Sequence, residues 1–119
     1  MILVDTSVWV DHFRRGDPSL ADLLSNGRVS MHPFVLGELA LGNLMPRAEI
    51  LQLLSDLPQA TVADENELLH IVESRKLMGL GIGLIDAHLI ASALLDACTL
   101  YTRDKRLLAV ATKLKLAHV

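Results

Sequence analysis

Short, fully apolar segments alternate along this chain with segments of helical periodicity, and no other feature constrains the fold as strongly. The short segments predict strands at residues 2–4, 29–31, 60–63, 98–102 and 116–119. Between them, apolar side chains recur every three or four residues, as in a helix. Strands without a polar face are typical of a parallel sheet covered by helices on both sides. We therefore predict an α/β fold, a three-layer α/β/α sandwich with a mostly parallel central sheet of four to five strands.

Capping residues, prolines and glycines place the expected helix ends. Asp64 and Glu67 have the spacing of a capping box. We expect helices from Thr6 or Ser7 to near Gly16, from Pro18 to before Asn26, from Pro33 to Gly42, from Pro46 to before Pro58, from Asp64 onward, over 84–95, and from Asp104 onward.

A chain of 119 residues, 51% of them apolar, suffices for a single domain with a sizeable core. We therefore treat residues 1–119 as one domain. Cys98 is the single cysteine, which excludes an intrachain disulfide framework and favours a reducing, cytoplasmic setting. No targeting segment is visible. Asp86 and Asp96 interrupt the longest apolar stretch, from Leu80 to Tyr101, which therefore predicts a buried helix and strand and no membrane span.

The charge of −3 is unevenly distributed. Residues 1–100 hold six basic and thirteen acidic side chains, whereas residues 101–119 hold five basic and one acidic. This balance argues against a protein that coats nucleic acid by charge alone, but it allows a basic patch beside an acidic pocket. Arg103, Lys105 and Arg106, next to Asp104, are candidate contacts to phosphate groups. The alternative is a solvated helix face.

Four carboxylates occupy informative positions. Asp5 directly follows the first predicted strand, and Asp104 lies just beyond the fourth. Ligands of open α/β sheets bind at the carboxyl ends of the strands, which is where both acids are expected. Glu38 and Asp86 fall among apolar residues of two predicted helices, where an unpaired charge is costly. No Lys or Arg lies within a helical turn of either acid.

Each acid also has an ordinary structural interpretation. Asp5 and Asp104 can cap helices, Asp86 can favour a helix N-terminus, and Glu38 can pair with a distant arginine. A single cause accounts for all four together, namely a divalent cation. Mg²⁺ and Mn²⁺ prefer carboxylate oxygens, and such a site activates water for attack on a phosphodiester.

The remaining candidate motifs are less informative. The loop from Gly79 to Gly83 matches neither a dinucleotide fingerprint nor a P-loop. The five histidines form no zinc-binding H-E-x-x-H pair, and we expect structural roles for them. His12, with Arg14 and Arg15, is either a phosphate contact or a solvated helix end. Cys98 is expected in the core.

Four segments together resemble the PIN-domain family, and most closely the VapC-like toxins of bacterial toxin–antitoxin pairs. These segments are Ile2-Leu3-Val4-Asp5-Thr6-Ser7, the helix with Gly37-Glu38, Leu84-Ile85-Asp86-Ala87-His88-Leu89-Ile90-Ala91, and Leu100-Tyr101-Thr102-Arg103-Asp104. The family's four acids match Asp5, Glu38, Asp86 and Asp104, and its small hydroxyl residues match Thr6, Ser7 and Thr102. Where some members carry a further acid or amide, this chain has Lys105, Arg106 and Leu107.

The resemblance implies a metal-dependent endoribonuclease that uses Mg²⁺, or alternatively Mn²⁺. Asp5 and Asp86 would be the direct metal ligands, and Glu38 and Asp104 would complete the site. It also implies a sheet ordered 3-2-1-4-5, a homodimer, and a cognate antitoxin that blocks the active site. Other functions remain open: a catalytically idle PIN scaffold that binds a protein or RNA, a DNA nuclease, or a broader role in RNA processing. A receiver-like signalling module is a further alternative, although no Lys follows the fifth predicted strand.

Overall fold

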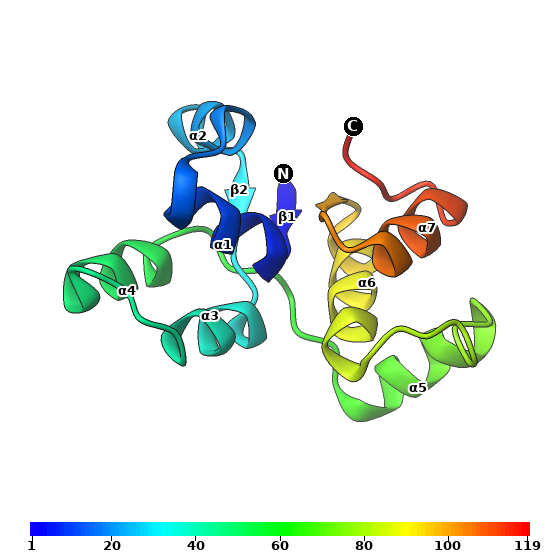
Figure 1. Cartoon of the computed structure of the whole chain (residues 1–119). Coiled ribbons are helices and arrows are strands. Elements are labelled where there is room, and N and C mark those ends of the chain that lie inside the picture. Colours follow the sequence, from blue (N-terminus) through cyan, green and yellow to red (C-terminus); the bar gives the residue numbers. More distant parts are fainter.

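The computed structural model describes all residues from 1 to 119 (Figure 1). Seven helices and three strands alternate in the order that the periodicity predicts. The elements are β1 (Ile2–Val4), α1 (Thr6–Arg15), α2 (Pro18–Ser25), β2 (Val29–Ser30), α3 (Pro33–Ala40), α4 (Arg47–Ser55), α5 (Glu65–Ser74), α6 (Leu84–Asp96), β3 (Thr99–Tyr101) and α7 (Lys105–Lys113).

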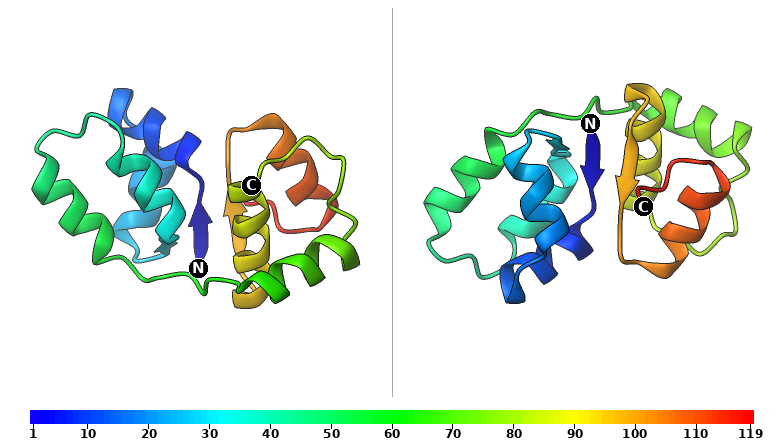
Figure 2. Two further views of the ribbon diagram at one scale, coloured as in Figure 1. Left: turned by 90° about the horizontal axis from the view of Figure 1, so that it is seen from below. Right: turned by 90° about the horizontal axis from the view of Figure 1, so that it is seen from above.

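A parallel three-stranded sheet, in the order β2-β1-β3, forms the centre of the fold. Leu3 of β1 lies opposite Ser30 of β2 and Leu100 of β3. Figure 1 shows α1 to α4 on one side of the central strand β1 and α5 to α7 on its other side. Both views in Figure 2 show β1 and β3 side by side. The predicted α/β fold with a parallel sheet flanked by helices is confirmed.

The predicted number of four to five strands is too high, because the outer two segments pair through single bridges. Gln59 bridges Met31 beyond β2, and Ala117 bridges Leu100 beyond β3. In segment 60–63, the amide of Thr61 donates to Asp96 Oδ2 at 2.9 Å, so this amide does not bond to a neighbouring strand. Segment 116–119 ends at Val119, which is fully exposed. Counted with these bridges, the five segments lie in the order 3-2-1-4-5 that the resemblance implies.

The core lies around β1, whose three side chains are at most 1% exposed. β1 therefore has no solvent face, as its fully apolar sequence predicts. Residues Ala87 to Ala93 of α6 are all buried, which confirms that the stretch from Leu80 to Tyr101 supplies an interior helix and strand. The described helices include none long and apolar enough to span a membrane.

Side chains cap the N-termini of the helices largely where the sequence predicts. Asp64 and Glu67 form the expected capping box at the start of α5, with bonds of 2.8 and 3.0 Å. His32 caps α3, because its Nδ1 accepts from the amide of Phe34 at 3.0 Å. No sequence signal indicates this cap, since histidine is not among the preferred capping residues.

Candidate functional site

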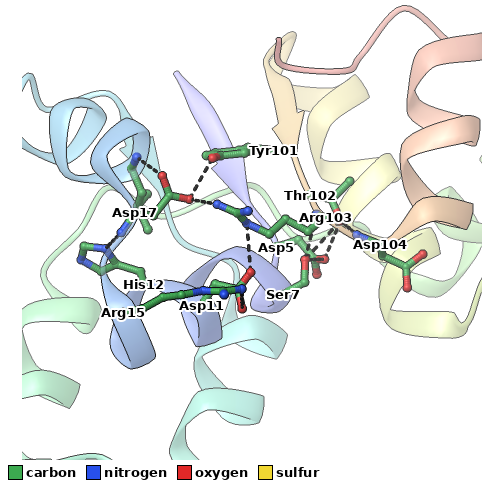
Figure 3. A network of polar contacts seen from close by, with 11 residues as sticks. Asp5, Ser7, Asp11, His12, Arg15, Asp17, Tyr101, Thr102, Arg103 and Asp104 are labelled. Carbon is green, nitrogen blue, oxygen red and sulfur yellow. Dashed lines mark hydrogen bonds and ion pairs between the residues drawn. The ribbon is translucent and has the colours of Figure 1, made fainter.

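The candidate site lies where β1 and β3 end. Asp5 directly follows β1, and Thr102 and Asp104 follow β3, which pairs in parallel with β1. Parallel strands bring their carboxyl ends to one edge of the sheet, so residues almost 100 positions apart in the chain become neighbours. Figure 3 shows Asp5, Ser7, Thr102 and Asp104 grouped at this edge.

Asp5 is held in place by two hydroxyl groups. Its side chain is 6% exposed, and its Oδ2 accepts bonds of 2.7 Å from both Ser7 Oγ and Thr102 Oγ1. Asp5 stands at the N-cap position of α1, but its side chain makes no capping bond. The capping interpretation of Asp5 is therefore wrong. Its Oδ1 makes no hydrogen bond to the protein and stays available to a ligand.

Asp104 does cap a helix, as its structural interpretation suggested. Its Oδ1 accepts from the amide of Leu107 at 2.9 Å at the start of α7. Its own amide donates to Thr102 Oγ1 at 3.0 Å, so one hydroxyl serves both acids. Oδ2 of the exposed Asp104 side chain has no partner in the protein. Capping thus fixes this carboxylate without using both of its oxygens.

Glu38 and Asp86 reach the same region from two helices. Thr6 Oγ1 donates to Glu38 Oε1 at 2.7 Å, which ties α3 to the first residue of α1. Asp86 lies in the first turn of α6, where the amide of Gly83 makes a long 3.4 Å contact with its Oδ2. Burial raises the pKa of Asp86, and the Gly83 amide opposes that rise. The negative charges of Asp5, Asp104 and Glu38 raise the same pKa further. The four acids therefore share one electrostatic environment.

The expectation that Glu38 and Asp86 lie on buried apolar faces is wrong for Glu38 and only half right for Asp86. Glu38 is exposed, and Asp86 is half-buried. Leu41, three residues after Glu38, is 90% exposed. The face of α3 that carries Glu38 thus opens to solvent, which removes the desolvation penalty that sequence reasoning assigned to it.

The chemistry of the four acids suits a divalent cation. Each has one oxygen engaged by the protein, whereas the other accepts no hydrogen bond. Asp11 and Asp17 are the only acidic partners in the chain's three ion pairs, so no basic side chain neutralises the four candidate acids. No three acidic, histidine or cysteine side chains converge closely enough to enclose an ion. The oxygen ligands of a metal site are therefore present. The acid side chains would have to rotate before they could contact one ion together.

Of the three predicted basic residues, Arg103 lies apart from the other two. The Arg103 guanidinium pairs with the carboxylates of Asp17 and Asp11 (Figure 3). Lys105 and Arg106 line a separate hollow of about 320 Å³ along α7, which also includes Lys113.

The sequence does not reveal the full structural role of Asp17. This side chain is 3% exposed, and it accepts bonds from the amide of Leu20, the hydroxyl of Tyr101 and the guanidinium of Arg103. Burial alone would raise the pKa of Asp17, but these bonds outweigh it and hold the pKa below its ordinary value. Asp17 directly before a proline signals a helix cap, and it fulfils that role. Nothing local indicates a partner 86 residues away.

The network of Asp17 extends to the acids. The Arg103 amide donates to Ser7 Oγ at 3.0 Å, and Ser7 in turn donates to Asp5. Arg103 thus has its guanidinium fixed by Asp17 and its backbone fixed beside Asp5. The ion pair between Arg103 and Asp17 therefore anchors the segment between Thr102 and Asp104 against α1 and α2.

The histidines and the cysteine have no visible role at the acids. Asp17 donates its amide to His12 Nδ1 at 3.0 Å. His32 and His88 lie in the interior with ring centroids 6.2 Å apart, and His32 Nε2 and His88 Nδ1 have no hydrogen-bond partner. Burial and the nearby His88 lower the pKa of His32 to about 4. Cys98 is a buried free cysteine before β3, as expected.

Known proteins resemble this chain in sequence and in fold. The family model of the PIN domain matches residues 2–113. Two relatives named ribonuclease VapC32, from the Mycobacterium tuberculosis strains CDC 1551 / Oshkosh and ATCC 25618 / H37Rv, are each 47% identical over 110 residues. The alignment covers 92% of this chain and 89% of each relative. The crystal structure of PAE2754 from Pyrobaculum aerophilum matches with a TM-score of 0.69 at 18% identity, over 98% of this chain and 87% of that chain.

Proposed function

Because the chain belongs to the PIN domain family, we propose that it is a metal-dependent endoribonuclease and the toxin of a toxin–antitoxin pair. The VapC32 ribonucleases, 47% identical to it, support this proposal. The observation that carries it is that Asp86 lies within electrostatic reach of Asp5, Glu38 and Asp104, although no three of these side chains enclose an ion as they stand. These acids come from four separate segments, none is ion-paired, and each has a free oxygen.

Asp5 and Asp86 are the direct metal ligands in this proposal. Two hydroxyls orient Asp5 so that Oδ1 remains free, and Asp86 experiences the repulsion of the other three acids. Glu38 and Asp104 complete the site. Bound Mg²⁺ or Mn²⁺ supplies positive charge that polarises the phosphodiester and makes a water more acidic. A cation there also relieves the repulsion that raises the pKa of Asp86.

The other residues position these groups. Ser7 and Thr102 fix Asp5, and Thr6 fixes Glu38. In this proposal, the exposed carboxylates of Glu38 and Asp104 accept a hydrogen bond from the attacking water and take up its proton. The water oxygen then forms a bond to phosphorus while the bond to the leaving sugar oxygen breaks, and that oxygen takes up a proton from solvent.

Lys105 and Arg106 are the proposed contacts to flanking RNA phosphates, because both border the hollow along α7 directly after Asp104. Arg103 was predicted to share this role. Its guanidinium is already paired with Asp17 and Asp11 through Nη2 and Nε, so we assign it chiefly to positioning.

A homodimer and a cognate antitoxin are the proposed protein partners, and the cytoplasm is the proposed location. Exposed apolar side chains after α3 and on α4 support a protein-binding surface there: Leu41 is 90% exposed, Met45 85% and Leu53 68%. Leu53 also lines an apolar hollow of about 310 Å³ against Trp9 and Phe13. This hollow contains none of the four acids, which separates it from the chemistry.

The test is cleavage of total RNA by the purified protein with Mg²⁺, with Mn²⁺ and with EDTA. We expect discrete products that require metal and are lost in Asp5→Asn, purified identically to control for contaminating nucleases. Equal cleavage by both proteins would contradict the proposal. An absence of both cleavage and Mn²⁺ binding would instead favour a PIN scaffold that only binds a partner.

A further inference from the structure

A groove between α1 and α3 opens directly beside Glu38, with a volume of about 390 Å³. We propose that it binds one unpaired nucleobase of the RNA next to the scissile phosphate, and that it thereby sets the sequence preference of cleavage. This inference rests on the proposed ribonuclease function. The residues that carry it are Val10, Phe13 and Arg14 of α1, and Glu38, Leu39 and Asn43 on or just after α3.

The groove includes Glu38 and runs along α1. Thr6 of α1 donates a hydrogen bond of 2.7 Å to Glu38, which links this helix to the acid that lines the groove. Thr6, Val10 and Arg14 are spaced four residues apart, so they share one face of the helix. Eight residues of helix place Arg14 about 12 Å along the axis from Thr6. A strand whose scissile phosphate lies at the acids can therefore extend along this face to Arg14.

The lining combines a fixed aromatic ring with an apolar floor. Leu39 is only 4% exposed and forms part of the floor, while Phe13 is 40% exposed and forms part of the wall. Trp9 stacks against Phe13 with ring centroids 5.9 Å apart at 27°, which limits the motion of the ring. Stacking on such a ring suits any base, because every base has a π-face.

Two polar side chains of the groove have no partner within the protein. Arg14 makes no ion pair or side-chain hydrogen bond, whereas the adjacent Arg15 pairs with Asp11 at 3.6 Å. Asn43 makes no side-chain hydrogen bond either. The chain just before Asn43 is nevertheless held in place, because Arg47 donates to the carbonyl oxygens of Ala40 and Gly42.

These groups match an unpaired nucleotide better than an apolar ligand. The Asn43 amide offers both a donor and an acceptor, as recognition of a base edge requires. The free guanidinium of Arg14 complements a phosphate on the far side of that base. Recognition of unstacked bases by an aromatic ring and a hydrogen-bonding side chain is a common mode of sequence-specific RNA binding.

The test compares cleavage of the mapped RNA target after each base around the cleavage position is changed in turn. For Asn43→Ala, we expect about a tenfold loss of discrimination at one base position. For Arg14→Ala, we expect a higher KM for all sequences with unchanged preference. Asn66→Ala and Arg75→Ala, at exposed positions on and just after α5, are the matched controls and should retain the wild-type preference. Thermal unfolding of each variant checks that the fold is intact.

A binding measurement keeps this inference separate from the proposed activity. Fluorescence anisotropy would follow labelled tetranucleotides of A, C, G or U on Asp5→Asn in EDTA, with and without Asn43→Ala. Preferential binding of one tetranucleotide, lost with Asn43→Ala, supports the groove even if the wild type cleaves nothing. If Asn43→Ala leaves both the cleavage preference and the binding preference unchanged, the inference is overturned, and the groove is left to a protein partner.

Discussion

Replacing Asp86 by asparagine should abolish cleavage without destabilising the metal-free protein. Asparagine has nearly the same shape, and its amide oxygen can retain the long contact from the Gly83 amide. The substitution removes a negative charge from a group whose pKa is raised by burial and by Asp5, Asp104 and Glu38. An Asp with a raised pKa is less favourable when ionised in the folded state, so at neutral pH its charge opposes folding.

The magnitude follows from opposing electrostatic effects. A carboxylate ~8 Å away repels by about 2 kcal/mol at an effective dielectric constant near 20. Screening over a Debye length of about 8 Å in physiological salt reduces that repulsion further. The negative charge at the N-terminus of α6 is itself favourable by roughly 0.3–1 kcal/mol, and this contribution is lost. The screened repulsion from three neighbouring acids is partly offset by the lost interaction with the helix N-terminus. We therefore expect Asp86→Asn to leave the free energy of unfolding unchanged or to raise it by about 1 kcal/mol.

Thermal unfolding of the wild type and Asp86→Asn, in EDTA and in Mg²⁺, measures this difference. In EDTA the variant should unfold at the wild-type temperature or up to about 4 °C higher. Mg²⁺ should raise the unfolding temperature of the wild type more than that of the variant, because ligand binding stabilises the folded state. Glu49→Gln, an exposed position on α4, is the matched control and should respond to Mg²⁺ as the wild type does. A loss of more than about 2 kcal/mol in EDTA would show that Asp86 is a structural aspartate and refute the reasoning.

Three further substitutions probe the groups around the acids. Arg103→Gln removes the cation from buried Asp17, and with Arg103 44% exposed we expect a loss of about 2 kcal/mol in urea unfolding; a loss below about 0.5 kcal/mol would contradict the anchoring role. Thr102→Val keeps the shape but removes the hydroxyl that bonds Asp5 and Asp104, and urea unfolding should show a loss of about 2 kcal/mol. The pKa of His32 is about 4 in the folded protein, so the unfolded chain takes up a proton below pH ~6.5 that the folded protein refuses. The free energy of unfolding should therefore fall by about 3 kcal/mol between pH 6.5 and 4. His32→Asn, which retains a capping acceptor, should flatten that fall, and an unchanged slope would contradict the assignment.

The sequence was most informative where a local pattern has a single three-dimensional consequence. A fully apolar β1 requires cover on both faces, and an acid directly after a parallel strand lies at its carboxyl edge. Asp5 and Asp104 were therefore placed correctly by their distance from the strands. Asp86 and Glu38 were selected because both fall among apolar residues of predicted helices and both match acids of the family, although Glu38 is exposed in the structure.

The remainder depends on contacts between distant parts of the chain. The bond between Asp17 and Arg103 joins residues 86 positions apart, and no local periodicity encodes it. Segment 60–63 has the composition of a strand, but the Thr61 amide bonds Asp96 and not a neighbouring strand. The groove beside Glu38 depends on how α1 and α3 pack, which sequence spacing alone does not determine.

Titration with Mn²⁺, followed by electron paramagnetic resonance of the free ion, tests most directly whether the four acids form one metal site. The wild type should bind Mn²⁺, and Asp5→Asn, Glu38→Gln, Asp86→Asn and Asp104→Asn should each weaken binding, with the largest effects at Asp5 and Asp86. Glu49→Gln should bind as the wild type does. Wild-type protein that binds no Mn²⁺, or that binds it as tightly as all four variants, would contradict the metal site.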